Sequence, residues 1–303
     1  MENIFFYKAF GLTIKSKIEC PELIPIEKQK SIDVSIIFAT FPDELADPVQ
    51  KSVRFQAKFN EFILKVDNVA KFFVKDGSEI VIEPESSEVE ERDIRLFLLG
   101  SAFGALIHQR GLLPLHGSVV QVGDSCVLFC GNSGTGKSTT ANTLLKKGYK
   151  LLSDDISVID LDENGQPFVY SGYPQQKLWK DALKRNKEDL TKLNKIRKVI
   201  NKYSIPIKEN FSNKRLPLKK IYVLSSHNNS EIEMNDVKGL QKFNVLKNQT
   251  YRFNFIKGLK NRDKHFKTSG RVCEQIPISI IKRPEGIDSV NDIAKLLVKD
   301  FEL

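Results

Sequence analysis

The chain has 303 residues, of which 41% are hydrophobic and 28% charged, a composition typical of a globular protein with one large or two modest domains. No segment approaches the roughly 18 apolar residues of a membrane-spanning helix, and the N-terminus lacks the features of a signal peptide. The four cysteines are scattered, without the Cys/His spacing of a zinc site. These features predict a cytoplasmic protein with no membrane partner.

The net charge of +9 and the pI near 9.2 suit an anionic partner such as a nucleotide or an acidic peptide. Much of the positive charge lies between Lys180 and Lys202, where apolar residues recur at roughly helical spacing. A solvated helix face is the simpler interpretation of this segment, and a specific anion site is the alternative. No nucleic-acid-binding motif is present, so nucleic acid is not an expected partner. The apolar residues of this segment are Leu183, Leu190, Leu193, Ile196, Val199 and Ile200.

The pattern of apolar runs and turns predicts a small, mostly β N-terminal domain of largely antiparallel strands over residues 1–88. Asp76-Gly77, between two apolar runs, is a hairpin signal. The acidic segment 83–92 predicts a linker, and residues 89–303 form the second predicted domain. Apolar runs, several of them β-branched or alternating, predict strands at 33–39, 53–59, 61–66, 72–74 and 79–82.

The second domain mixes strands and helices, which predicts an α/β (α+β) fold. An apolar stripe predicts a helix over 92–110, closed by Gly111. Two buried strands are then expected around the Gly123-Asp124 turn, followed by a glycine-rich loop and a helix over 139–147. The remaining predictions are strands at 118–122, 126–130, 151–155, 156–161, 220–225 and 278–282, and helices at 239–247 and 290–301.

Residues 131–138 match the P-loop pattern G-x-x-x-x-G-K-S/T at every fixed position, with a predicted strand before the loop and a predicted helix after it. The glycines allow the backbone amides to turn inward as an anion nest at the positive end of a helix. Lys137 supplies a mobile charge for the β and γ phosphates, and the Ser138 hydroxyl is a Mg²⁺ ligand. A chance match is the alternative. The predicted cofactors are therefore ATP and Mg²⁺, bound by Gly131, Asn132, Ser133, Gly134, Thr135, Gly136, Lys137, Ser138 and Thr139.

Two further features accompany the loop. Asp154-Asp155 ends the next apolar run, where a Mg²⁺–nucleotide site needs an acid. One carboxylate could hold metal while the other accepts a proton, although neighbours in a strand point to opposite faces. His116 starts the strand before the loop strand and could contact substrate, phosphate or an aspartate. The alternatives are a solvated acidic turn and a structural histidine.

Together, His116-Gly117, the loop at 131–138 and Asp154-Asp155 resemble the HPr kinase/phosphorylase family. The run Lys-Lys-Gly-Tyr-Lys-Leu-Leu-Ser before Asp154 is also similar to that family. The resemblance covers about residues 111–160 and implies a P-loop kinase core related to ATP-type phosphoenolpyruvate carboxykinase. The N-terminal segment differs from that of HPr kinase.

Beyond this core, the chain is similar to the HPr-kinase-like proteins encoded in lasso-peptide biosynthetic clusters. Those proteins are implicated in phosphorylating the C-terminal Ser of a peptide precursor. The similarity is softer than that of the core, because members of this branch vary widely. The similar stretches are residues 9–12, 20–23, 110–117, 173–179, 216–222 and 251–252.

The resemblance implies that Asp154 is the general base, that Asp155 is tied to the metal or to active-site order, and that His116 lies beside the catalytic aspartate. It carries over no residue past Asp155. Lys177 and Arg252 are the basic residues to test for charge stabilisation, and a surface ion pair is the alternative for each. Family members form hexamers, so a homo-oligomer is an open expectation here.

Three functions remain at this point. The first is a kinase that acts on a serine of a peptide or protein, in which Asp154 accepts the proton while Lys137 and Mg²⁺ neutralise developing charge. The second is a nucleotide-binding module that regulates a partner. The third is a small-molecule enzyme, such as a free-serine kinase or a carboxykinase-like decarboxylase. The last gains little support, because none of the four histidines clusters with acids in the sequence.

Overall fold

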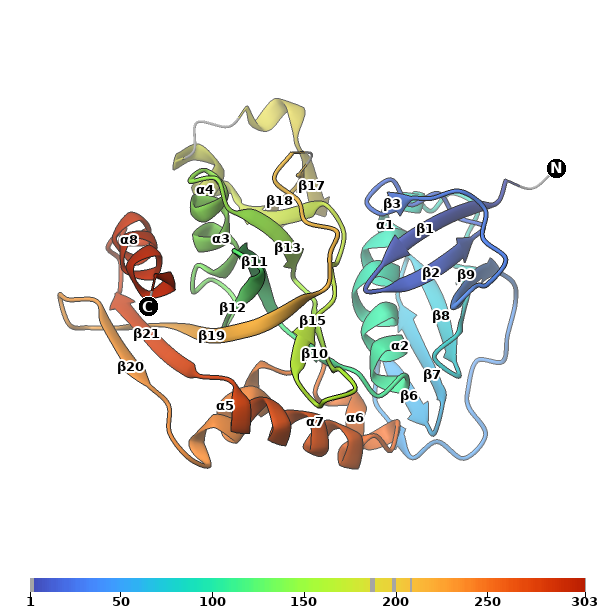
Figure 1. Cartoon of the computed structure of the whole chain (residues 1–303). Helices are drawn as coiled ribbons and strands as arrows, with labels where there is room; N and C mark the ends of the chain where they lie inside the picture. The colour runs from blue at the N-terminus through green and yellow to red at the C-terminus, as the bar shows by residue number, and fades with distance from the viewer. Residues whose placement is uncertain (1–2, 186–188, 198–199, 208, 303) are drawn as a thin grey trace. The chain divides into compact units, whose positions relative to one another are not determined.

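The computed structural model describes residues 3–185, 189–197, 200–207 and 209–302 (Figure 1). Their contacts divide the chain into two compact units. Unit 1 comprises residues 1–114 and 250–268, and unit 2 comprises residues 115–249 and 269–303. Both units combine sheets with helices, which confirms the predicted mixed α/β class. No helix in the described ranges is long and apolar enough to cross a membrane.

Unit 1 is built on one sheet with the strand order β3-β1-β2-β4-β9-β8-β7-β6-β5. Among its described residues, only the β2–β4 and β4–β9 pairings are parallel, so the sheet is mostly antiparallel, as predicted. Asp76 and Gly77 both have positive φ, at 53° and 62°, as the predicted hairpin turn requires. The strands are β1 (Phe5–Ala9), β2 (Leu12–Ser16), β3 (Ile24–Pro25), β4 (Val34–Phe38), β5 (Gln50–Lys51), β6 (Phe55–Lys58), β7 (Glu61–Val66), β8 (Ala70–Lys75) and β9 (Glu79–Pro84).

The predicted helix over 92–110 is present as α1 (Glu91–Phe97), a π-helical turn (Leu98–Ala102) and α2 (Phe103–Gln109). Figure 1 shows these helices along one face of the sheet of unit 1. The Gln109 amide donates to Val74 O at 3.0 Å and accepts from Gly77 N at 2.8 Å. By their contacts, residues 89–114 therefore belong to unit 1 together with the N-terminal sheet. The predicted domain boundary at residue 88 stays a prediction. Unit 1 also contains α6 (Phe255–Gly258) and the first part of α7 (Arg262–Gln275).

The main sheet of unit 2 runs β14-β15-β19-β12-β11-β13, and β21 and β20 extend it beside β19. β12 lies between β19, to which it is parallel, and β11, to which it is antiparallel. The predicted strands and helices of this region are confirmed. The strands that lie wholly within this unit are β11 (Gly117–Val122), β12 (Ser125–Gly131), β13 (Lys150–Asp154), β14 (Ser157–Leu161), β15 (Pro167–Val169), β19 (Leu216–His227), β20 (Glu233–Asp236) and β21 (Ile278–Pro284). β10 (Leu113–Leu115) begins in unit 1 and ends at the first residue of unit 2.

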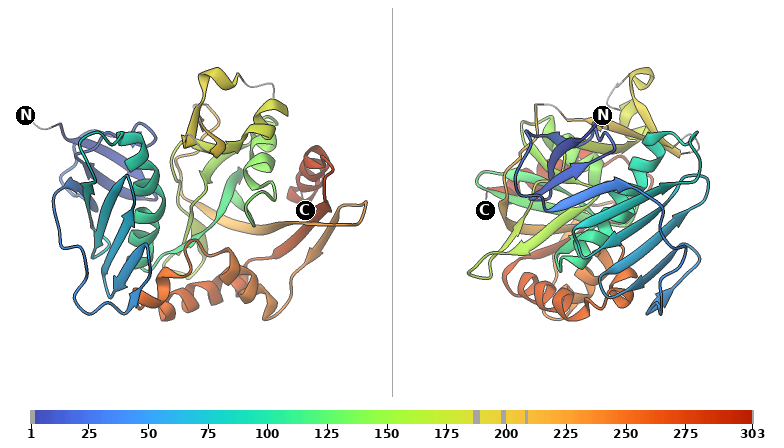
Figure 2. Two further views of the ribbon diagram at one scale, coloured as in Figure 1. Left: turned by 180° about the vertical axis from the view of Figure 1, so that it is seen from behind. Right: turned by 90° about the vertical axis from the view of Figure 1, so that its right-hand side faces the viewer.

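Two helices cover one face of this sheet, α3 (Lys137–Leu145) and α8 (Val290–Phe301), and Figure 2 shows them near each other. Phe129 of β12, Leu144 of α3 and Leu297 of α8 belong to one buried apolar cluster. Every residue of β12 from Cys126 to Gly131 is buried. The loop after β12 therefore starts from a buried strand, which fixes its origin. This unit also contains α5 (Gln241–Gln249) and the later part of α7.

The prediction of a helix across the Lys-rich segment is wrong beyond its first turns. The chain forms α4 (Lys180–Arg185), a 3₁₀ turn (Leu190–Lys192) and two strands, β17 (Asn194–Arg197) and β18 (Ile200–Pro206), and β18 pairs with β16 (Gln175–Trp179). Tyr203 packs in a small core with Leu178 and Leu183, and the flanking Lys202 and Ser204 are less buried. Alternation in β18 thus overrides the helical spacing. Val199 lies outside the described residues.

Candidate active site

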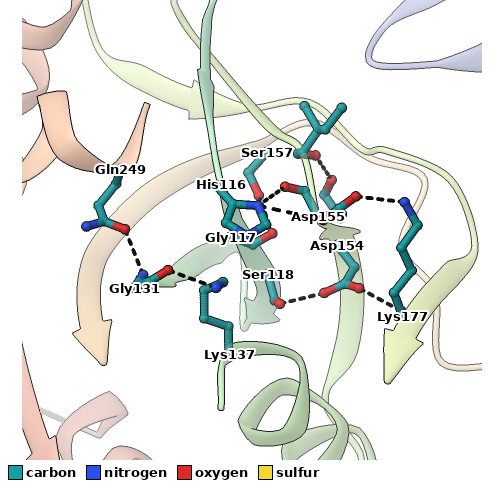
Figure 3. Close-up of polar contacts among 12 residues, drawn as sticks. His116, Gly117, Ser118, Gly131, Lys137, Asp154, Asp155, Ser157, Lys177 and Gln249 are labelled. Carbon is teal, nitrogen blue, oxygen red and sulfur yellow. Dashed lines mark hydrogen bonds and ion pairs between the residues drawn. The ribbon is translucent and has the colours of Figure 1, made fainter. Parts of the chain in front are cut away.

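The site forms where three strands of unit 2 meet (Figure 3). β11 is antiparallel to both of its neighbours, so its first residues lie beside the last residues of β12 and β13. Gly117 pairs with Cys130 on one side, and Ser118 pairs with Asp154 on the other. This reversal places the His116 segment between the P-loop and the paired aspartates, although the three segments are separated in sequence.

Two glycines permit this close approach. A Cβ on Gly117 would lie 2.5 Å from Phe129 O, and a Cβ on Gly131 would overlap Leu224 O. Gly131 also has a φ of 139°, which side chains rarely allow. The Gly117 carbonyl accepts a hydrogen bond from Ser157 Oγ at 3.1 Å. Strand spacing at the site therefore depends on the absence of these two side chains.

The P-loop has the backbone that its sequence predicts. Gly134 and Gly136 have φ values of 87° and 105°, and α3 begins directly after them, at Lys137. The Lys137 ammonium donates to Gly131 O at 2.8 Å and to Asn132 O at 3.0 Å, so it lies over the loop. Burial lowers the pKa of Lys137 from its ordinary value. A buried cation beside a helix N-terminus is a strong attractor for phosphate.

Asp154 is a buried acid with both oxygens bonded to protein. Ser118 Oγ donates to Oδ1 at 2.5 Å, and the Lys177 backbone N–H donates to Oδ2 at 2.8 Å. Burial raises the pKa of Asp154, and these two hydrogen bonds oppose that rise. Asp154 therefore ties β13 to β11 and β16.

Asp155 has a different environment. Its φ is 72°, and Ile156 N bonds to Asp154 O at 2.9 Å, which together define a γ-turn of the rare, strained kind. Lys177 Nζ lies 2.7 Å from Asp155 Oδ2. Burial alone would raise the pKa of Asp155, but the positive charges of Lys177 and Lys202 outweigh it and hold that pKa well below its usual range, and His116 adds to their effect only at the low pH where its ring is protonated. The turn aims an ionised carboxylate away from the neighbouring Asp154.

The ring of His116 bonds to Asp155, and its backbone bonds to Gln249. Its Nδ1 lies 2.9 Å from Asp155 O, and because a carbonyl can only accept, Nδ1 carries the proton. Its backbone N–H donates to Gln249 O at 2.8 Å. Burial lowers the pKa of His116, and the nearby Asp155 charge opposes that change. Near neutral pH the ring is therefore uncharged, with Nε2 as an acceptor.

These groups surround one pocket. The P-loop contributes its backbone and Lys137, and the opposite wall carries His116 and Asp155. Asp155 lines the pocket, whereas Asp154 is not among the described lining residues. The described residues that line the pocket are His116, Gly117, Ser118, Ser133, Gly134, Gly136, Lys137, Ser138, Thr139, Asp155, Lys177, Leu178, Trp179 and Lys202.

The donors at this pocket suit a magnesium ion. Mg²⁺ prefers hard oxygen ligands and is held by one or two protein groups together with substrate phosphates. The Ser138 hydroxyl and the Asp155 carboxylate both line the pocket and are donors of that kind. Within the described residues, no group of three or more His, Cys, Asp or Glu side chains is arranged to hold a metal.

The structure places some of the predicted site residues at this pocket, together with residues that the sequence did not single out. The structure brings His116 and Asp155 to the same pocket as most of the loop, with Asp154 behind them and with Lys177 as the ion-pair partner of Asp155. Gly131, Asn132 and Thr135 are not among the described lining residues of this pocket. Arg252 belongs to unit 1, where its guanidinium lies 5.6 Å from the centre of the Tyr251 ring. The missed residues are Ser118, Trp179, Lys202 and Gln249.

The buried strand, the glycine loop and the following helix define unit 2 as a P-loop protein. Residues 113–184 match the family model of the HPr Serine kinase C-terminal domain. This part of the chain is therefore similar to the catalytic core of the HPr kinase family, which confirms the resemblance drawn from its motifs.

Individual relatives support the same core over short stretches. The HPr kinase/phosphorylase of Clostridium beijerinckii is 45% identical over 49 residues, 16% of each protein. That of Clostridium tetani is 41% identical over 64 residues, 19% of this chain and 20% of the relative, and that of Lactobacillus johnsonii is 49% identical over 41 residues, 14% and 13% respectively. The matched stretch thus spans a fifth or less of these relatives.

A structure of the Hpr(Ser) kinase/phosphatase from Coxiella burnetii aligns with a TM-score of 0.33 and 11% sequence identity, over 62% of this chain and 95% of that one.

Proposed function

We propose that the protein is an ATP- and Mg²⁺-dependent kinase that transfers a phosphoryl group to a serine hydroxyl. The observation that carries this proposal is the pocket in which Lys137 on the P-loop faces Asp155 and His116. A phosphate nest opposite a polar, ionised wall has the parts that phosphoryl transfer requires, which are charge neutralisation on one side and acceptor positioning on the other. The HPr-kinase-type core at residues 113–184 supports the same chemistry.

In this mechanism the loop amides and Lys137 bind the β and γ phosphates. The serine oxygen attacks the γ phosphorus, a new O–P bond forms, and the bond to the β-phosphate oxygen breaks. The serine proton passes to a carboxylate on the opposite wall. Mg²⁺, held with the help of Ser138, would neutralise charge on the leaving phosphate.

The geometry favours Asp155 over Asp154 as the carboxylate that meets the acceptor. Asp155 lines the pocket, whereas both oxygens of Asp154 are already bonded to Ser118 and Lys177. The low pKa of Asp155 keeps it ionised at neutral pH. In a loose transition state the acceptor loses its proton late, so positioning outweighs basicity. We therefore assign acceptor contact to Asp155 and the ordering of the site to Asp154, which exchanges the roles implied by the family resemblance.

The acceptor class is a serine in a peptide or protein. The net charge of +9 suits an acidic polypeptide, and the softer resemblance to lasso-cluster kinases favours the C-terminal Ser of a peptide precursor. A free-serine kinase and a non-catalytic nucleotide-binding module are the alternatives.

A transfer assay with γ-labelled ATP and Mg²⁺ tests this proposal. Wild type and Lys137→Ala are compared on a Ser-ended precursor peptide, on HPr and on free serine. Label on the peptide or on HPr that disappears in the variant supports the kinase. Label on free serine alone favours the small-molecule enzyme. Lys137-dependent ATP binding without label on any acceptor contradicts the kinase and favours the binding module.

A further inference from the structure

Unit 1 contains a second concentration of positive charge, besides the Lys-rich segment after β16. Residues 250–268, which form α6 and the first part of α7, include six Lys or Arg residues and one acid, Asp263 (Figure 1). These 19 residues therefore contribute +5 to a net charge of +9. The six cations are all exposed, and they are Arg252, Lys257, Lys260, Arg262, Lys264 and Lys267.

These cations lack carboxylate partners. Within the described residues, none of the six forms an ion pair. Elsewhere in the same unit, by contrast, Lys51 Nζ lies 2.8 Å from Glu44 Oε1, and Lys71 Nζ lies 2.7 Å from Asp43 Oδ1. Like charges that are close together repel one another, and an anionic partner relieves that repulsion.

Two of the cations are held by packing of their aliphatic stems. A Cβ on Gly104 of α2 would lie 3.7 Å from Arg252 Cγ, and a Cβ on Gly111 would lie 2.6 Å from Lys264 Cδ. Both stems therefore lie against α2 and the turn that follows it. A cation held in this way loses less conformational entropy when it binds a partner.

Two phenylalanines lie among the cations. Phe253 is 38% exposed and Phe266 is 65% exposed. His265 of α7 joins the loop before α6 to this helix, because its Nε2 lies 2.9 Å from Thr250 Oγ1 and its ring centre lies 5.5 Å from that of Phe253. Arg262 and Phe266, four residues apart in α7, are neighbours on its exposed side. The loop and the start of α7 thus form one surface that combines cations with phenyl rings.

This combination favours one class of partner. Positive charge alone would suit a nucleic acid or an acidic polypeptide equally well. The chain has no nucleic-acid-binding motif, and the proposed function requires a polypeptide partner. Phenyl rings between cations match a polypeptide that carries both acidic and apolar side chains.

We propose that this basic–aromatic surface, formed by the six cations with Phe253 and Phe266, binds an acidic segment of the polypeptide whose serine is phosphorylated. The inference rests on the proposed function for the identity of the partner. It assigns recognition of the polypeptide to unit 1 and phosphoryl transfer to unit 2. It also gives Arg252 a role in partner binding, where the sequence left charge stabilisation and a surface ion pair as alternatives.

The test uses two fluorescent peptides that end in Ser and differ only in charge, because every Glu of the first is Gln in the second. Anisotropy measures their binding to the full chain without nucleotide, so the result does not depend on phosphoryl transfer. We expect wild type to bind the Glu peptide at least about tenfold more tightly than the Gln peptide.

Three variants locate the binding. Arg262→Gln combined with Lys267→Gln should weaken binding of the Glu peptide by about fivefold and leave the Gln peptide unchanged, because it removes charge alone. Lys8→Gln combined with Lys15→Gln is the matched control, since these lysines are exposed on β1 and β2 of the same unit and the change in net charge is identical. This control should bind both peptides as wild type does. Phe266→Ala should weaken binding of both peptides by about threefold, because an apolar contact does not depend on charge.

Equal binding of the two peptides by wild type would overturn the inference, as would equal losses in the surface variant and its control. An unchanged affinity in Phe266→Ala would contradict the apolar contact. Tighter binding of a labelled single-stranded DNA than of the Glu peptide, lost in the same surface variant, would assign the surface to nucleic acid instead. Binding of the Glu peptide without phosphoryl transfer would support the surface while contradicting the kinase. Transfer to both peptides with equal KM would support the kinase while overturning the surface.

Discussion

The P-loop and the Lys-rich segment after β16 are the two most conspicuous sequence features of this chain, and they behave in opposite ways. The loop at 131–138 adopts the conformation that its motif predicts, because the glycines allow the positive φ angles of the loop and Lys137 bonds to the loop backbone. The segment from Lys180 to Lys202 contradicts its helical spacing and ends in β18. A motif that encodes backbone conformation fixes structure locally, whereas charge and apolar spacing do not.

The two regions nevertheless contribute to one pocket. Lys202 of β18 and Trp179 of β16 line it together with Lys137. The sequence of the Lys-rich segment leaves a solvated surface and an anion site as alternatives. Because Lys202 lines the pocket, part of the segment lies at the proposed phosphate site. Substitutions in either region should therefore lower the rate of phosphoryl transfer, but to different extents.

The largest effect is expected in the loop. Lys137→Ala should lower the rate of phosphoryl transfer by roughly 1,000-fold, because it removes the buried cation that neutralises charge in the transition state. Steady-state kinetics with saturating ATP measures this loss. A rate within tenfold of wild type would show that the loop does not serve transfer.

The paired acids give the next effect. Asp155→Asn should lower the rate by about 100-fold, while Asp154→Asn should act mainly by disturbing the Ser118 and Lys177 hydrogen bonds. Denaturant unfolding separates the two, since Asp154→Asn should reduce stability more for an equal loss of rate. The opposite ranking would restore Asp154 as the acceptor contact.

A smaller effect is expected in the Lys-rich segment. Lys202→Gln should lower the rate by about tenfold, because Lys202 lines the pocket and its charge acts on Asp155. Lys184→Gln is the matched control, since Lys184 lies in the same segment but is exposed and does not line the pocket. Equal losses in the two variants would show that the segment acts only through its overall charge, and not through the position of Lys202 at the pocket.

The smallest effect concerns the ionisation of His116. Burial lowers its pKa, so NMR titration should find the ring neutral at pH 7 and protonated only at a pH below the ordinary value near 6.5. Asp155 opposes that shift, so Asp155→Asn should move the titration to still lower pH. A midpoint that moves upward in this variant would contradict the contact between Asp155 and His116.

The sequence predicted the elements around the site because their signals are local. It placed His116, the loop and the aspartates near one another through a family resemblance, and the structure supplies the physical reason in the antiparallel register of β11. Gln249 had no local signal. It bonds to Gly131 N from a position 118 residues away along the chain. The γ-turn that separates Asp155 from Asp154 is equally hidden, because Asp155 lacks the following glycine that marks the positive φ of Asp76 in the Asp76-Gly77 turn.

The most direct test of the central claim is to follow the γ-phosphate itself. Wild-type protein, labelled ATP, Mg²⁺ and a serine-containing peptide are incubated, and the peptide is analysed for phosphoserine. The proposed mechanism predicts label on the serine oxygen in stoichiometric amounts, with none in Lys137→Ala. Release of the label as inorganic phosphate alone, or an equal yield in the variant, would contradict a kinase site at the ends of β11, β12 and β13.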